Sequence, residues 1–595
     1  MCGIAGLAGH FAAAHGRAVA ARMSDTLVHR GPDDAGLWAT DGFAFAMRRL
    51  AIIDLAGGQQ PMWTDDGIGI VFNGEIYNYR ALRAELEAEG CAFRTRSDTE
   101  ILLQGYRREG LAFVARLEGM FAFCLYDPAR RELHLVRDRF GVKPLYYALI
   151  GGVFYFASEI KAILAALPQR PELSRQALHD YLTLRFVPTP DTIWDGIRKL
   201  PPAHTLSLSL TGGEPRLGRY WRLDFHAEPL DRGRDYVAEF GALFLAAVEK
   251  RLLAADVPVG VLLSGGLDSS AVLAAAAELG HRELHTFCVG FADGGDYDES
   301  AFARAAASQA GARHHEVMIT RQQFLDFLPR FAGLSDEPLA DLASVPLYYV
   351  SELARSEVKA VLSGEGSDEL LAGYDFDRMA RRYDRLQAVE GWVRGPLRRL
   401  LAACPLGGAA GEWLRLWGRH GWQGMAAARP SHMTRHWSHA AKSALWRDSS
   451  GLSGTEERIR SWYEPLAGRH PLDQIQQVYC GDWLTEDLLM KADKMSMAAS
   501  LELREPFLDH RLAEWTARLP LSWRVGSAAS GYCSKRVLRA FCSGRIPQSV
   551  IERPKRGFPV PAYGWLAQGL GGWAQALVLG PTARLRDRFD MAAAR

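Results

Sequence analysis

The sequence predicts two units of different fold class: an α+β sandwich of stacked antiparallel sheets between helices, then an α/β unit built on a parallel sheet with added helices. Three observations support this. The chain has 595 residues, too many for one hydrophobic core. Short apolar segments separated by turn residues dominate the first 200 positions or so, as in antiparallel sheets. Further along, apolar segments alternate with helical stretches, as in a doubly wound sheet.

The overall composition excludes several classes of protein. Hydrophobic residues make up 48% of the chain, charged residues 23%, and the formal net charge is +1, so we expect neither nucleic acid nor a membrane surface as a partner. No apolar stretch is long enough to span a bilayer, and the amino-terminal segment lacks the basic start of a signal peptide. The eight cysteines are scattered without a CxxC pair, which favours a cytoplasmic location over a disulfide framework or a zinc site.

The first unit contains short apolar strands and one clear amphipathic helix. The helix is expected over about Tyr79–Glu89, with Leu82 and Leu86 on one face. The strands are expected at Ile68–Phe72, Met120–Tyr126, Leu133–Val136 and Val153–Phe156. Many strands distant in sequence with few helices predict stacked antiparallel sheets.

Cys2 is the most informative single residue of this unit. If Met1 is removed, Cys2 carries both a thiol and a free α-amino group. That amino group has a reference pKa of about 7.7–8.0, so it can accept the thiol proton near neutral pH without a histidine. A cysteine at position 2 is by itself more often accidental than catalytic, so its interpretation depends on the residues that follow.

Polar residues near the strand ends suit attack on an amide. Asn73 and Gly74 would offer a side-chain amide and a backbone N–H to an oxyanion, and a glycine lets the backbone approach closely. A free amino-acid substrate needs an arginine for its carboxylate and acids for its ammonium group, which Arg49, Glu75 and Asp98 would supply. Each feature alone has an ordinary explanation, because Asn-Gly is a common hairpin turn and surface charges are usually only solvated.

The segments MCGIAG, HRGPD, RRLAIID, NGEIYN and SDTE, in this order, resemble the class II glutamine amidotransferase domain of the N-terminal-nucleophile hydrolases. The resemblance covers the whole first unit. It implies Cys2 as the nucleophile and Asn73 with Gly74 as the oxyanion site. It also implies that glutamine is bound by Arg49, Leu50, Ile52, Ile53, Asn73, Gly74, Glu75 and Asp98.

The pattern changes after Leu200-Pro201-Pro202, and we expect the hinge within about 205–230. This divides the chain into a first unit of residues 1–210 and a second unit of residues 211–595. The boundary is weakly marked, because a Pro-Pro pair also occurs in loops inside a domain.

A glycine-rich turn opens the second unit. The apolar segment Pro258–Leu263 is interpreted as a buried parallel strand, followed by SGGLDSS (Ser264–Ser270) and an alanine-rich helix over Ala271–Leu279. Backbone N–H groups at such a turn and the helix dipole make an anion site. The turn lacks the Gly-Lys-Ser/Thr ending of a Walker A loop. By itself it would be an ordinary strand–helix connection.

Further strands are expected at Leu284–Phe291, His315–Ile319 and Val358–Leu362. The last one leads into a second loop, Ser363–Glu369, and ligands of parallel sheets lie beyond the carboxyl ends of the strands. Asp268 and Asp368, one from each loop, are therefore predicted to hold Mg²⁺, which prefers carboxylates together with substrate phosphates. The alternative for Asp368 is that it merely caps a helix.

SGGLDSS is the PP-loop motif of ATP pyrophosphatases. Together with SGEGSDE and Lys491–His510, it resembles the synthetase domain of the glutamine-dependent asparagine synthetase family. That resemblance implies that Glu365 acts as a base toward ammonia and that Lys555, in RPKRGF, stabilises charge on the adenylate. It implies ATP binding by Leu263, Ser264, Gly265, Gly266, Asp268, Ser269, Val289, Ser363 and Gly364.

The family reaction implied for this chain is a ligation. Glutamine would supply ammonia through an interior passage, ATP would activate a carboxylate as its acyl-AMP with Mg²⁺ as cofactor, and aspartate would become asparagine. The oligomeric state is left open, a homodimer being one option. Three alternatives stay open: another carboxylate (an acidic sugar, a peptide or a secondary-metabolite precursor), a plain glutaminase, and a non-catalytic protein.

The resemblance is weakest around the acceptor. Leu342 and Ala343 stand where family members commonly carry small hydroxyl residues, and Glu505 replaces a common apolar residue. The span from about 375 to 470 is expected to be mostly helical and carries no motif that we can assign. These departures leave the activation chemistry in place and put aspartate as the acceptor in doubt.

Overall fold

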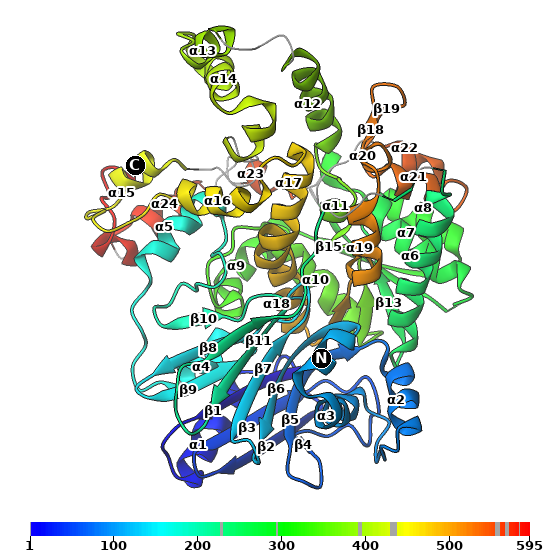
Figure 1. Cartoon of the computed structure of the whole chain (residues 1–595), viewed down its shortest axis with the longest axis vertical. Coiled ribbons are helices and arrows are strands. Elements are labelled where there is room, and N and C mark those ends of the chain that lie inside the picture. The colour runs from blue at the N-terminus through cyan, green and yellow to red at the C-terminus, as the bar shows by residue number, and fades with distance from the viewer. Residues whose placement is uncertain are drawn as a thin grey trace.

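The structure is a computed structural model that describes residues 2–225, 230–231, 233–281, 283–292, 295–390, 396–428, 437–553, 560–565, 571–581 and 583–594. The first unit contains two six-stranded sheets whose neighbouring strands all run antiparallel (Figure 1). One sheet has the order β10 (Ile197–Lys199), β8 (Tyr146–Ile150), β9 (Val153–Ala157), β1 (Cys2–Ala8), β3 (Phe43–Arg49) and β2 (Asp34–Thr40). The other has the order β12 (Arg216–Arg219), β11 (His204–Ser209), β7 (Glu132–Arg137), β6 (Gly119–Asp127), β5 (Gly69–Ile76) and β4 (Met62–Trp63).

The two sheets stack face to face, with helices on their outer faces. Apolar side chains of both sheets, among them Ile4 and Phe45 from one and Val71 and Leu135 from the other, share one buried cluster. Outside lie α1 (Ala13–Asp25) and α4 (Ile160–Ala166) on the first sheet, and α2 (Tyr79–Ala88) and α3 (Asp98–Glu109) beside the second. The predicted sandwich of antiparallel sheets between helices is confirmed.

The second unit is built on a five-stranded parallel sheet. Its order is β15 (Arg313–Ile319), β14 (His285–Phe291), β13 (Val259–Leu262), β16 (Ala360–Leu362) and β17 (Glu502–Arg504). Helices α7 (Leu267–Glu278) and α8 (Ser300–Ala310) contact this sheet, as do α10 (Ser344–Arg355) and α18 (Met490–Ala498). The parallel sheet is confirmed. The edge strand β17 was not anticipated, because three residues give too short a pattern to recognise.

The stretch that carries no motif is helical, as expected. It forms α12 (Phe376–Glu390), α13 (Pro396–Ala402), α14 (Gly408–Ala428), α15 (His439–Leu445) and α16 (Thr455–Tyr463). In Figure 1, α12, α13 and α14 project at the end of the molecule opposite the antiparallel sheets. No helix in the described part of the chain is both long and apolar enough to cross a membrane.

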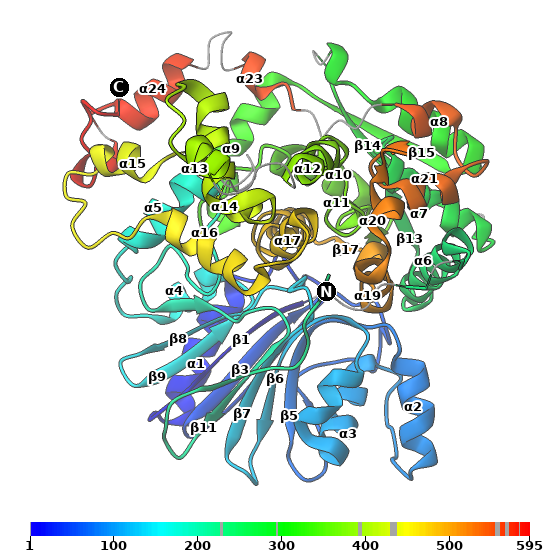
Figure 2. The same cartoon turned by 45° about the horizontal axis from the view of Figure 1, so that its top comes forward.

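The junction between the units positions the functional residues. The amino terminus lies between the antiparallel sheets and the second unit (Figure 2). Within the expected hinge, β12 still pairs with β11, and α6 (Tyr236–Leu253) follows it. The division of the chain at residue 210 stays a prediction.

Candidate functional site

Cys2 is the first residue of β1 and is buried. In the sheet it lies opposite Arg49 of β3. Its backbone N–H donates to Asn73 Oδ1 at 2.9 Å, and its carbonyl accepts from Arg30 Nε at 3.1 Å. The structure therefore brings the start of the chain together with the end of β3 and with β5, as the candidate nucleophile and oxyanion residues require.

Asn73 has an unused donor at this point. Its side chain is fully buried, and Nδ2 has no acceptor among the described residues. A buried amide N–H without a partner costs free energy, so its presence indicates a ligand oxygen. Gly74 follows with φ of +154°, and a Cβ there would lie 2.1 Å from the carbonyl oxygen of Met120. Only glycine fits this position.

We expect Gly74→Ala to lower glutaminase activity by roughly 100-fold or more, because the new methyl group must displace the backbone that presents the oxyanion donors. Glutamate release from glutamine measures this. Gly90→Ala is the matched control, since Gly90 also has positive φ, at +90°, but a Cβ there meets nothing within 4 Å. Equal loss in both variants would mean that general strain, not the oxyanion site, causes the effect.

The Cys2 thiol is not activated by its surroundings alone. Burial raises the pKa of this thiol, opposed by the positive amino terminus and by the backbone of Leu50. The thiol therefore favours its protonated form and would need a base in order to act as a nucleophile. A free α-amino group on the same residue would be that base.

The residues expected to hold glutamine lie around this thiol. Leu50, Ile52 and Ile53 are buried directly after β3. The Arg49 guanidinium donates to the carbonyl oxygens of Ile53, Asp54 and Leu55 at 3.0, 2.7 and 3.2 Å. These three bonds hold the loop after β3, while Arg49 Nε donates to none of the described residues.

Glu75 and Asp98 form a buried acidic pair at the other side. Asp98 Oδ2 accepts the Ile76 N–H at 3.0 Å, and Glu75 Oε2 has no partner among the described residues. Burial raises the pKa of Glu75, and the neighbouring Glu502 and Asp98 raise it further. The pKa of Asp98 is raised to about 6, mainly by burial. An ammonium group placed here would relieve both carboxyls.

The raised pKa of Asp98 gives a pH dependence. Below about pH 6 this carboxyl is protonated and loses its attraction for an ammonium group. We therefore expect KM for glutamine to rise as the pH falls through about 6. Initial rates at several pH values measure this, and Asp98→Asn should remove that inflection. An inflection that survives in Asp98→Asn would assign it to another group.

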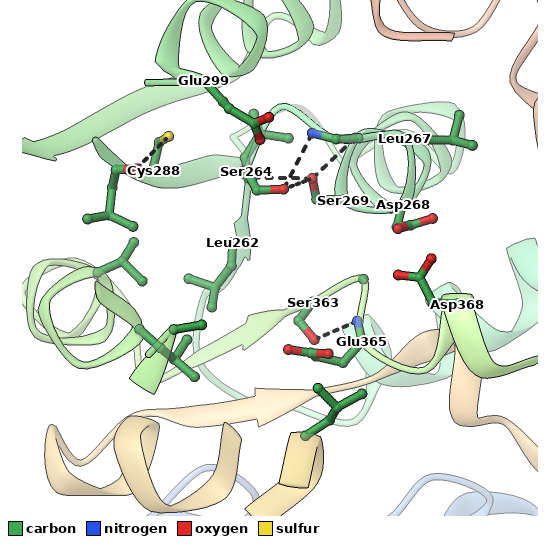
Figure 3. Close-up of a pocket in the computed structure, with 18 of the residues that line it drawn as sticks. Leu262, Ser264, Leu267, Asp268, Ser269, Cys288, Glu299, Ser363, Glu365 and Asp368 are labelled. Carbon is green, nitrogen blue, oxygen red and sulfur yellow. Dashed lines mark hydrogen bonds between the residues drawn. The ribbon is translucent and has the colours of Figure 1, made fainter. Parts of the chain in front are cut away.

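The second candidate site is a cavity of about 320 Å³ at the carboxyl ends of β13 and β16, beside the middle of β14 (Figure 3). Its lining includes most of the residues predicted to bind ATP, namely Leu263, Ser264, Gly266, Asp268, Ser269, Val289, Ser363 and Gly364. Gly265 has φ of +73°, and a Cβ there would lie 2.7 Å from the Ala303 backbone nitrogen. The turn between β13 and α7 is therefore held tightly against α8.

The two acidic loops converge as predicted. A Cβ on Gly364 would lie 2.8 Å from the Asp268 Cβ, so the loop after β16 rests directly on the start of α7. The side chains of Asp268 and Asp368 point toward each other at one side of the cavity (Figure 3). Ser367 Oγ donates to Asp268 Oδ1 at 2.9 Å, which fixes this arrangement.

Lys535 lies between these two aspartates and was missed by the sequence analysis. Its Nζ contacts Asp268 Oδ1 and Oδ2 at 2.6 and 2.7 Å, and Asp368 Oδ1 at 2.7 Å. The two carboxylates can thus share one cation, so the residues present fit Mg²⁺, whose donors are carboxylate oxygens. Lys555, the lysine selected from the sequence, lies outside the described residues.

Glu365 belongs to a series of ion-paired side chains at the cavity wall. Its Oε1 lies 3.4 Å from Lys491 Nζ, which also lies 3.2 Å from Asp341 Oδ2. Tyr374 and Trp483 line the same cavity, and Trp483 comes from the π-helical segment η5 (Tyr479–Leu489), a distortion frequent at functional sites. None of the four was predicted as a site residue. Lys491 begins the segment Lys491–His510 that carries the family resemblance, but that resemblance assigned it no role; Tyr374 and Trp483 lie in no assigned motif.

The edge strand β17 touches both candidate sites. Leu503 lines the cavity, and the Arg504 carbonyl accepts the Ser363 N–H at 2.9 Å. Arg504 Nη2 lies 3.5 Å from Glu75 Oε1 and Nε donates to Glu502 Oε1 at 2.6 Å. Successive side chains of a strand point to opposite faces, so three residues connect the two sites.

We expect Arg504→Gln to raise KM for glutamine about 10-fold while ammonia-driven turnover stays within about twofold. Without this cation the pKa of Glu75 rises further, so its carboxyl is expected to attract the substrate ammonium group less strongly. Steady-state kinetics with each nitrogen donor measure this. Glu502→Gln is the control, because it removes a charge that raises the same pKa and should not raise KM. Equal losses with both donors would instead indicate damage to the fold.

Comparisons with known proteins match both parts of the chain. A family model described as a glutamine amidotransferase domain matches residues 1–221, and one described as asparagine synthase matches residues 239–595. Asparagine synthetase (glutamine-hydrolyzing) 1 of Bacillus subtilis (strain 168) is 33% identical over 561 residues, covering 94% of this chain and 86% of the relative. Asparagine synthetase (glutamine-hydrolyzing) 3 of the same bacterium is 32% identical over 578 residues, covering 93% and 86%. Amidase chry2 of Gibberella zeae is 30% identical over 581 residues, covering 91% and 84%.

Proposed function

This chain belongs to the asparagine synthase family, and we propose that it converts aspartate to asparagine through an aspartyl-AMP intermediate, with ammonia taken from glutamine. As a member of that family it is a ligase that carries out glutamine-dependent amidation. The observation that most supports the finer proposal is the pair of facing carboxylates, Asp268 and Asp368, with Lys535 between them at the phosphate-binding turn.

At the first site the chain's own residues would cleave glutamine. The α-amino group of Cys2 takes the thiol proton, and the sulfur attacks the side-chain amide carbon of glutamine. Asn73 Nδ2 and the Gly74 N–H stabilise the oxyanion, while Glu75 and Asp98 hold the substrate ammonium and Arg49 its carboxylate. Ammonia leaves, and water hydrolyses the thioester to glutamate.

At the second site the carboxylate of the acceptor would attack the α-phosphorus of ATP and release pyrophosphate. Backbone N–H groups of the Ser264–Ser270 turn and the start of α7 hold the phosphates, and Lys535 offsets their charge. Asp268 and Asp368 would hold Mg²⁺, which neutralises charge on the leaving pyrophosphate when bound. Glu365, fixed beside Lys491, would take a proton from ammonia as it displaces AMP.

Ammonia must stay neutral between the two sites. We propose an interior passage along the junction, past β17. Glu505, the residue after β17, is buried, and burial raises its pKa to about 8. At pH 7 this carboxyl is mostly neutral, so it does not favour ammonium there. Its position explains why a carboxyl is tolerated where relatives often carry an apolar residue.

The test supplies glutamine, ATP and Mg²⁺ and compares AMP release with aspartate against a panel of other carboxylic acids. Aspartate should give the highest kcat/KM, with one asparagine formed per AMP. Asparagine is identified by mass spectrometry, using amide-¹⁵N glutamine to trace the transferred nitrogen. If adding aspartate does not increase AMP release while another acid does, asparagine formation is rejected and the ligase chemistry is retained.

A second candidate acceptor is a carboxylate other than aspartate. Ala343 lines the cavity where a hydroxyl residue is common, and the aromatic rings of Tyr374 and Trp483 add apolar surface. Such a wall suits an acceptor with an apolar or ring-shaped part. The same panel distinguishes the two candidates. We further propose that the enzyme works in the cytoplasm, either alone or as a homodimer.

A further inference from the structure

Two histidines and a glutamate gather at the end of the parallel sheet that lies away from the nucleotide cavity. His285 is the first residue of β14, His315 belongs to β15, and Glu357 lies in the turn between α10 and β16. In the sheet His285 pairs with Arg313, and His315 lies two residues further along β15. The two imidazoles therefore stand on the same face. Helix α10 packs on β14 and β15, which carries Glu357 to the same place.

The ligand atoms are close enough to share one ion. His315 Nε2 lies 3.1 Å from His285 Nδ1, which lies 3.8 Å from Glu357 Oε2, and all three atoms lie within 4.8 Å of one another. Tetrahedral zinc with bonds of about 2.0–2.1 Å places its ligand atoms roughly 3.3 Å apart. The observed separations therefore need only small side-chain shifts.

The surroundings orient the rings and leave one coordination position open. The two imidazoles stack at 5.1 Å with 11° between their planes, and Phe287 stacks on His315 at 5.0 Å. The Glu357 side chain is 40% exposed, so water can take a fourth position. Two imidazoles, one carboxylate and a water form a donor set typical of zinc.

We propose that His285, His315 and Glu357 form a zinc-binding site that links the amino ends of β14 and β15 to the turn before β16. Further along the same strand, Cys288 and Val289 in the middle of β14 line the nucleotide cavity. Zinc bound here stabilises the strand on which one wall of that cavity depends, and it does so without taking part in the ligase reaction. An ion that binds the folded chain and not the unfolded chain raises the unfolding temperature.

The test uses the full-length, metal-free protein titrated with ZnCl₂ by calorimetry. We expect about one zinc ion per chain in the wild type, with affinity lowered at least about 100-fold in His315→Ala and in Glu357→Gln. His314→Ala is the matched control, because the neighbouring His314 contacts Thr286 and Glu316 instead and should leave binding unchanged. Zinc should raise the thermal unfolding temperature of the wild type and of His314→Ala. It should not raise that of His315→Ala or Glu357→Gln.

A second measurement uses only the wild type, so its result does not depend on whether the variants fold. Co²⁺ added to the metal-free protein should give the intense visible absorption of a four-coordinate ion, displaced by zinc. Weak absorption typical of six-coordinate Co²⁺ would overturn the proposal, and so would equal zinc uptake by the wild type and His315→Ala. His285 and His315 would then form only a hydrogen bond between their imidazoles.

Discussion

Replacing Cys2 by alanine is expected to lower glutamine-driven amidation by roughly 10⁴-fold or more and to spare ammonia-driven amidation. In the proposed mechanism the thiol acts only on glutamine, and the cavity that would bind ATP is lined by residues of the second unit. Product formation with glutamine and with ammonium salts at the same pH measures both rates. The thiol is also small and buried, so alanine should leave the fold intact.

Cys2→Ser is the matched control for this change. It keeps the size and the α-amino group but replaces the thiolate by a much weaker nucleophile, so it should behave like alanine. The mass of the purified wild type should correspond to a chain without Met1. Full glutamine activity in a chain that retains Met1 would contradict the proposed base, and equal loss of both activities in Cys2→Ala would contradict the division into two sites.

Replacing Lys535 by alanine is expected to lower amidation about 10²- to 10³-fold with either nitrogen donor, while glutamine hydrolysis continues. The lysine contacts both Asp268 and Asp368, so its loss leaves two facing carboxylates without the cation between them. Acceptor-dependent exchange of labelled pyrophosphate into ATP measures the activation step directly. Lys535→Arg keeps the charge and should restore part of the exchange.

Lys555→Ala tests which of two lysines matters more for the activation step. Lys555 was selected from the sequence, and Lys535 was selected from the structure. If Lys535 stabilises the adenylation step, its alanine variant should lose exchange more severely than Lys555→Ala. Exchange at the wild-type rate in Lys535→Ala would reject its role. Retained glutaminase activity in the same sample shows that the first unit is folded.

Short motifs and the family resemblance that they carry predicted the two candidate sites, and the pattern of apolar segments predicted the class of each sheet. Cys2, Asn73 and Gly74 lie in short segments that carry the family resemblance, and the Ser264–Ser270 turn lies between its own strand and helix. Such features are visible in sequence because each segment is recognisable by itself, although Cys2 and Asn73 come together only in the fold. The stacked antiparallel sheets and the parallel sheet follow from periodicity, which depends only on which face of each element is buried.

The tertiary structure alone decided which distant charges complete each site. Lys535 lies 267 residues after Asp268, in a segment with no recognisable pattern, and reaches the phosphate turn only because the chain folds back over α7. Arg504 reaches Glu75 because the three-residue strand β17 closes the edge of the parallel sheet beside the first unit. Electrostatic partners act through space at a few ångströms, and no spacing rule along the chain records that distance.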